Sequence, residues 1–200
     1  MLSKRTLLIT LFVGCVFFLS LLFCFILERS ITASPKSIIE NVVLVSKPKP
    51  IIPGLPLRLK IPNISIDAPI DSVGVTFDGA VDVPKGPADV AWFNLGPRPG
   101  DIGSAVITGH YGTWKNGGGS VFDNLNKLIP GDKIYVEDEK GMIITFVVRE
   151  LRIYGQNEYA PGVFNSDDGK AHLNLITCAG DWIESQKTYS NRLVVFTDKE

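Results

Sequence analysis

Residues 173–180 read Leu-Asn-Leu-Ile-Thr-Cys-Ala-Gly, and they form the most informative stretch of this chain of 200 residues. Mixed apolar and polar residues in a short run that stops at a glycine predict a β-strand whose end a ligand backbone can approach. Cys178 is its last reactive side chain and the only cysteine outside the apolar N-terminal segment. In an exported domain it would lack an intrachain disulfide partner, which indicates either an intermolecular bridge or a free thiol with a chemical role.

The N-terminal part of the chain is expected to anchor it in a membrane. Residues 7–27 are uncharged and almost entirely apolar, a length of about 20 residues that suits a helix crossing a bilayer. Lys4 and Arg5 precede this segment, so residues 1–6 are expected in the cytoplasm and the rest outside. A cleaved signal peptide is the alternative, but its apolar core is normally shorter, about 7–15 residues.

The next segment, residues 28–56, is expected to be a linker because it is rich in proline, which favours an extended and semi-stiff backbone. Residues 57–200 then form one domain, long enough for a single core. This domain is mildly acidic and has no basic stripe, which argues against a nucleic-acid partner.

The apolar pattern of the domain has mostly a period of two in short pieces, which is typical of a β-barrel. The expected strands cover residues 57–61, 64–70, 80–83, 104–108, 133–137, 142–153, 171–177 and 192–197, with a hairpin turn at 138–141. Short helices are expected over 88–95 and 120–128. The predicted fold class is mainly β, a closed eight-stranded barrel with short helices, preceded by one transmembrane helix.

His110 is a candidate partner for Cys178 because it also follows a predicted strand and precedes a glycine-rich loop. An imidazolium stabilises a nearby thiolate and can protonate a leaving amine. From the residues alone, a satisfied structural histidine is the more common case. The other histidine, His172, lies in mid-strand and is expected to face solvent.

Arg192 opens the last predicted strand. Its guanidinium could stabilise the negative charge that develops on a carbonyl oxygen during acyl transfer, or clamp the carbonyls of an extended peptide. The alternative is a surface arginine paired with Asp181 or Glu184.

In combination, these segments resemble the sortase family. The resemblance covers residues 57–198 and keeps the order His, Cys, Arg along the chain, and it is placed among classes D, E and F without a choice between them. Asn174 departs from the family's usual Thr-Leu-x-Thr-Cys signature, since it stands where the first Thr is expected. The matching pieces are Thr108-Gly109-His110, Leu175-Ile176-Thr177-Cys178 and Arg192-Leu193-Val194-Val195, with Leu59–Ile64, Ala68–Ile70 and Gly131-Asp132.

The resemblance implies a cysteine transpeptidase outside a bacterial cytoplasmic membrane. Cys178 would attack the carbonyl after the Thr of an LPxTG-like sorting signal and form a thioacyl enzyme. His110 would protonate the leaving amine and then activate an acceptor amine, from a peptidoglycan precursor or a pilin lysine, while Arg192 holds the substrate. The implied substrate contacts are Thr177, Asn174 and Trp182, with specificity in the loops 154–170 and 181–191.

No cofactor or metal is expected. The acidic pieces 137–139 and 167–168 suit charged, solvated turns better than a calcium site, which needs many oxygen ligands. Two other functions stay open. A non-catalytic, membrane-tethered β-domain that binds a peptide or protein would not need the three reactive residues. An L,D-transpeptidase fits less well, because that family places its Arg almost adjacent to the Cys.

Overall fold

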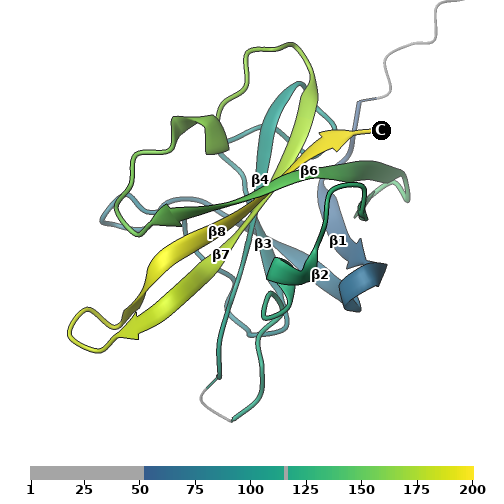
Figure 1. Ribbon diagram of the computed structural model, residues 1–200. Coiled ribbons are helices and arrows are strands. Elements are labelled where there is room, and N and C mark those ends of the chain that lie inside the picture. Colours follow the sequence, from purple (N-terminus) through teal and green to yellow (C-terminus); the bar gives the residue numbers. More distant parts are fainter. Residues whose placement is uncertain (1–51, 115–116) are drawn as a thin grey trace, which may run out of the picture. The chain divides into compact units, whose positions relative to one another are not determined.

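The computed structural model describes residues 52–114 and 117–200, and in them eight strands close into a barrel (Figure 1). The predicted mainly β fold with a closed eight-stranded barrel is therefore confirmed. In chain order the strands are β1 (Pro56–Ile61), β2 (Ile66–Val73), β3 (Val90–Phe93), β4 (Gly103–Gly109), β5 (Lys133–Asp138), β6 (Ile143–Gly155), β7 (Ala171–Ile183) and β8 (Thr188–Lys199).

Around the barrel the strand order is β1-β2-β3-β4-β7-β8-β6-β5, and β5 pairs back onto β1. Every pairing is antiparallel except β2 with β3 and β4 with β7. Because β4 and β7 run in the same direction, their C-terminal ends lie at the same rim of the barrel. The antiparallel partner β8 brings its N-terminal half to that rim as well.

Alternate residues along the strands fill the barrel and form the main core. On β7, for example, Leu173 and Leu175 are fully buried inside it. A second, smaller cluster lies on the other face of β7 and β8, where Val194 and Phe196 pack with Val163 from the β6–β7 loop. Packing in this outer cluster holds the β6–β7 loop against β7 and β8, and the candidate site lies beside the cluster.

The helical content is lower than the sequence suggested. Only three short 3₁₀ turns occur in the described ranges: η1 (Pro62–Ile64), η2 (Leu125–Lys127) and η3 (Pro161–Val163). The helix predicted over 120–128 is wrong except for η2. Phe122, Leu125 and Leu128 are all buried in the core, and their spacing of three favours a 3₁₀ turn over an α-helix.

Three other expectations are wrong in detail. Within residues 88–95, Val90–Phe93 form strand β3, paired on both sides, and no helix is present. Residues 80–83 form no strand and contribute only an isolated bridge between Val75 and Val81. Residues 181–191 are largely the tip of a hairpin in place of a loop, because β7 continues to Ile183 and β8 begins at Thr188. The predicted turn at 138–141 is confirmed, with the Gly141 N–H bonded to the Asp138 carbonyl.

Hydrogen bonds to the barrel begin in the residues just before β1. The Gly54 N–H donates to the Asp138 carboxylate at 2.7 Å, and Arg98 donates to the Pro53 carbonyl at 3.2 Å. The predicted anchor at 7–27 and the linker up to residue 51 lie outside the described residues. Within the described ranges, no helix combines the length and the apolar character that a membrane crossing requires.

Candidate active site

Strand pairing brings Cys178 and Arg192 to one rim of the barrel, and the end of β4 leads to His110 at the same rim. Cys178 on β7 is directly opposite Arg192 on β8 in the antiparallel register. On the other side of β7, the parallel pairing with β4 ends at Thr108 opposite Ile176, and His110 and Cys178 follow two residues further along each chain. The central cysteine is therefore flanked by histidine on one side and arginine on the other.

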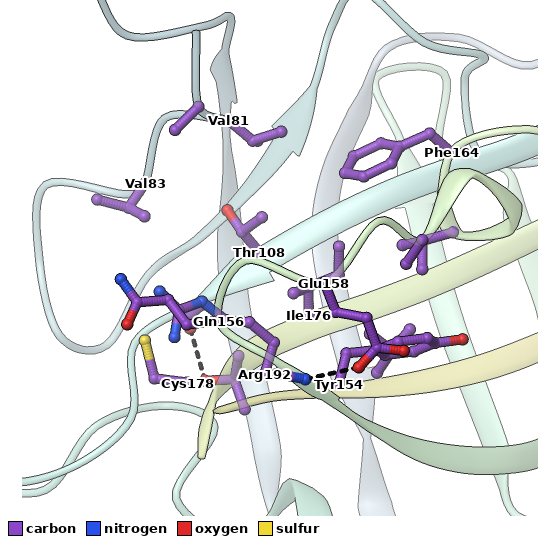
Figure 2. A pocket seen from close by; sticks show the side chains of 17 residues that line it. Val81, Val83, Thr108, Tyr154, Gln156, Glu158, Phe164, Ile176, Cys178 and Arg192 are labelled. Carbon is purple, nitrogen blue, oxygen red and sulfur yellow. Dashed lines mark hydrogen bonds between the residues drawn. The ribbon is translucent and has the colours of Figure 1, made fainter. Parts of the chain in front are cut away.

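Cys178 and Arg192 border a cavity of about 380 Å³ on the outer face of the barrel, which Gly109, the residue before His110, also lines. Thr108 and Ile176 both line it, and because side chains alternate along a strand, Cys178 shares that face. Figure 2 shows the Cys178 sulfur toward one end of the cavity and Phe164 toward the other. The walls are mostly apolar and come from the β2–β3 loop (Val81, Val83), from the β6–β7 loop (Ala160, Val163, Phe164) and from Ile176 and Val194.

Cys178 is a free, partly exposed thiol. Burial raises the pKa of this thiol above its ordinary value, and the positive charge of Arg192 opposes that rise. The thiol form therefore predominates at neutral pH. Arg192 is the group that favours the thiolate, so removing its charge would make the nucleophile scarcer.

His110 is oriented by the main chain of the β2–β3 loop. Its Nε2 lies 2.7 Å from the Pro84 carbonyl oxygen. A carbonyl can only accept, so Nε2 carries the proton and donates, which leaves Nδ1 as the nitrogen that can take up or release a second proton. The ring also packs against Trp114, with centroids 4.8 Å apart. The Pro84 carbonyl thus fixes the tautomer, as the third group of a catalytic triad does.

Arg192 is held in place by its own hairpin. Nη1 donates to the carbonyls of Tyr189 at 3.0 Å and Asn191 at 2.9 Å, and Nη2 donates to the Thr188 hydroxyl at 3.2 Å. The alternative, a surface arginine paired with an acidic side chain, is not found among the described residues. A guanidinium held by neutral carbonyls keeps its full charge, and it is available to the cavity that it lines.

Comparison with known proteins identifies the family of this arrangement. The family model for the sortase domain matches residues 59–200. The chain belongs to the sortase family. Its fold is also that of solved sortases, although no curated protein sequence is similar enough to count as a match.

Sortase C-1 from Actinomyces oris is 26% identical, with a TM-score of 0.57 and coverage of 72% of each chain. Sortase C1 from Streptococcus agalactiae is 23% identical, with a TM-score of 0.56 over 73% of this chain and 69% of that one. A lid mutant of sortase A from Corynebacterium diphtheriae is 22% identical, with a TM-score of 0.58 over 76% and 74% of the two chains. The last two comparisons show the fold alone.

The structure places the three predicted substrate contacts of this sortase differently. Thr177 borders the cavity, but its buried hydroxyl donates to the Gly109 carbonyl at 2.8 Å and ties β7 to β4. Asn174 borders a different, smaller cavity and donates to the Val163 carbonyl at 2.6 Å. Trp182 is exposed on the β7–β8 hairpin, where its indole N–H donates to Glu184. Only Thr177 therefore lies at the cavity beside Cys178.

Several contributors to the site carried no signal in the sequence. The Pro84 carbonyl is a main-chain group, and Val81 and Val83 belong to a piece that looked like a strand. Gln156 and Glu158 are the polar residues of the cavity wall that the β6–β7 loop forms, and no pattern in the sequence singled them out from the rest of that loop. A proline following alternating valines could have indicated a loop edge, but not its position over a histidine far along the chain.

His172 is the clearest error about a single residue. It is buried, with 6% of its side chain exposed, in place of facing solvent. Its Nδ1 lies 2.8 Å from Asp198 Oδ1 and its Nε2 lies 3.0 Å from Asp168 Oδ1. The buried imidazole thus lies between a carboxylate four residues earlier in the chain and one on the last strand. Among the described residues, no group of three or more His, Cys, Asp or Glu side chains is arranged to hold a metal ion.

Proposed function

We propose that this sortase is a membrane-anchored cysteine transpeptidase that cleaves an LPxTG-like sorting signal after its Thr and transfers the protein to an amine. The observation that supports it most is the placement of Cys178 between Arg192 and the strand end that leads to His110, at one end of an apolar cavity. Nucleophile, proton carrier and fixed cation are the three groups that acyl transfer needs.

In the first half of the reaction, the Cys178 thiolate attacks the carbonyl carbon of the Thr. Negative charge develops on the carbonyl oxygen, and Arg192 stabilises it or holds the neighbouring carbonyls. The carbon–nitrogen bond to the following glycine then breaks, a thioester forms, and His110 delivers its second proton to the leaving amine.

In the second half, an acceptor amine attacks the thioester. His110, now neutral, takes the proton that the amine loses, and the thiolate of Cys178 leaves. The acceptor is an amine of a peptidoglycan precursor or a pilin lysine. Water in place of the amine gives slow hydrolysis of the same thioester.

The cavity suits the apolar part of such a signal. Its two walls, Val81 and Val83 on one loop and Val163 and Phe164 on the other, offer an apolar channel that leads to Cys178 (Figure 2). A leucine and a proline would lose their hydration there at a gain of about 25 cal/mol per Å² of buried apolar surface. The Thr would then lie at the polar end, beside Cys178 and Arg192.

The proposed location rests on the apolar N-terminal segment. Residues 7–27 would hold the protein in the cytoplasmic membrane of a bacterium, with the barrel outside, where secreted proteins and cell-wall precursors meet. The uncharged apolar composition of that segment supports this placement.

The test uses the full-length protein in detergent with a panel of sorting peptides and hydroxylamine as the acceptor. The expected product is the peptide cleaved after Thr and carrying a hydroxamate, detected by mass. The rate should pass through a maximum with pH, because the reaction needs the Cys178 thiolate, whose pKa is raised, together with a protonated general acid. Absence of hydroxamate from every peptide, or an unchanged yield with Cys178→Ala, would exclude the proposed enzyme.

A further inference from the structure

An aromatic cluster lies on the side of Cys178 formed by the β7–β8 hairpin. The ring of Tyr189 meets that of Tyr111 at a centroid distance of 5.2 Å and an angle of 77°. It meets Trp182, its cross-strand partner, at 5.2 Å and 70°. Edge-to-face pairs of this kind are favourable beyond the surface they bury. Since Tyr111 directly follows His110, Tyr189 joins the hairpin to the segment that carries the histidine.

The hydroxyl of Tyr189 also lies against the backbone of Gly112. A Cβ at position 112 would overlap this hydroxyl, and the φ of Gly112 is +92°, a conformation that side chains rarely adopt. The peptide groups of Gly112 are themselves fixed. Its N–H donates to Asp123 at 2.7 Å, and its carbonyl accepts from the Ser120 hydroxyl at 2.6 Å. Tyr189 therefore packs against a backbone position that hydrogen bonds hold in place.

On its other side, Tyr189 belongs to the site itself. Its carbonyl accepts from Arg192 Nη1 at 3.0 Å. Burial raises the pKa of its phenol, and the charges of Tyr111, Cys178 and Asp123 act in the same direction. One residue thus contacts both the segment after His110 and the hairpin that holds Arg192 opposite Cys178.

We propose that Tyr189 is a positioning residue for the transfer reaction: its ring seats the segment that carries His110 against the strand pair that carries Cys178 and Arg192. The inference rests on the proposed function, because it concerns the same site. His110 lies beyond the end of β4, so strand pairing does not fix it. A displacement of about 1 Å in such a group can cost on the order of 100-fold in rate.

A double-mutant cycle tests the coupling in the full-length protein. We expect His110→Ala to lower kcat about 100-fold and Tyr189→Ala about 30-fold, with KM nearly unchanged. If Tyr189 acts through His110, the double variant is no more than about threefold slower than His110→Ala alone. A further loss of about 30-fold in the double variant, as independent roles would give, overturns the proposal.

A second readout needs no substrate and separates this inference from the proposed function. The pH dependence of Cys178 alkylation by iodoacetamide is followed by mass spectrometry of the peptide that contains it. We expect His110→Ala to shift this profile in the wild-type background but not in the Tyr189→Ala background. An equal shift in both backgrounds overturns the inference, even if the transfer reaction itself is established.

Matched variants separate positioning from a loss of fold. Tyr189→Phe keeps the ring and should retain kcat within about threefold, whereas Tyr135→Ala, at a half-buried tyrosine on β5, should leave kcat unchanged. If Tyr189→Ala does not fold, Tyr111→Ala serves instead, because it removes the ring against which Tyr189 packs on the segment that carries His110. It should lower kcat as Tyr189→Ala is expected to do. A wild-type kcat in Tyr111→Ala, or a Tyr189→Phe variant as slow as Tyr111→Ala, overturns the proposal.

Discussion

The two histidines of this sortase, His110 and His172, lie at opposite ends of the parallel pair formed by β4 and β7. His110 makes one polar contact, from Nε2 to the Pro84 carbonyl, and among the described residues nothing bonds Nδ1. His172 has both ring nitrogens on carboxylates, and it is buried between them. An imidazole can exchange protons with a substrate only if one nitrogen is open. The same type of side chain is therefore the proposed proton carrier at one end and a structural tie at the other.

The largest difference between the two should appear in turnover. We expect His110→Gln to lower kcat for transpeptidation by about 10²–10⁴-fold, the usual contribution of a general acid–base group. His172→Gln should leave kcat within about threefold but lower the free energy of unfolding by about 2 kcal/mol, because an amide cannot reproduce both contacts of the imidazole, with Asp168 and with Asp198. Peptide turnover and urea unfolding, measured on both variants, check the contrast.

The contrast between the two histidines would be contradicted if both variants lost activity, or if the variant expected to lose activity lost stability in its place. A His172→Gln variant that folds normally yet turns over as slowly as His110→Gln would mean that the distant tie governs the chemistry. A His110→Gln variant that loses stability while keeping its rate would mean that the histidine beside Pro84 has only a structural role.

A second prediction concerns the acid sensitivity of the structural tie. The pKa of Asp168 lies well below its ordinary value, chiefly because it accepts a hydrogen bond from His172, and also from the Lys170 N–H and the Ser166 hydroxyl. A carboxyl with a depressed folded pKa stabilises the fold above its unfolded pKa of about 3.9, and this contribution is lost as the pH falls toward the folded value. We therefore expect the wild type to lose stability steeply below about pH 4.

Asp168→Asn sharpens that prediction. The variant should be less stable than the wild type at pH 7 and should lose less stability on acidification, because it no longer has that proton to bind. Urea unfolding at a series of pH values measures both differences. If the variant loses stability below pH 4 as steeply as the wild type, another bond is the acid-sensitive one.

The sequence was sufficient for the elements whose pattern is local. Strands β1, β4 and β5 show clear alternation or a continuous apolar run between turn residues, and the predicted strands overlap them. Strand β3 was missed because Val90–Phe93 is short and is set by its neighbours. Its parallel pairing with β2 and antiparallel pairing with β4 depend on residues that are distant in the sequence.

The candidate site was predictable to the same extent. Cys178 and Arg192 lie opposite each other inside β7 and β8, whereas the sequence placed them at strand ends, and His110 directly follows β4, so a barrel that closes correctly brings all three toward one rim. The burial of His172 was not predictable, because its partners Asp168 and Asp198 come from a loop and from the last strand. A charged side chain looks solvent-exposed in a sequence until its counter-charges are placed in space.

The smallest predicted effect concerns Asn174, which lies on β7 between the two ends. Its Nδ2 donates to the Val163 carbonyl, while its buried Oδ1 has no hydrogen-bond partner within residues 52–114 and 117–200. Asn174→Ala loses one good bond and also removes one unsatisfied acceptor, so the net loss of stability should be only about 1 kcal/mol. Because Val163 forms a wall of the cavity, KM for the sorting peptide should rise about threefold with little change in kcat.

Asn174→Thr is the matched control, since a threonine at this strand position keeps a polar group that can bond to Val163 and suits the extended backbone. It should restore most of the stability and the KM of the wild type, as urea unfolding and peptide kinetics would show. If Asn174→Ala lowers kcat as strongly as a change at His110, then the wall and the reactive rim are one unit. In that case, the residues of β7 that stabilise the fold and those near the reactive rim would not have separate roles.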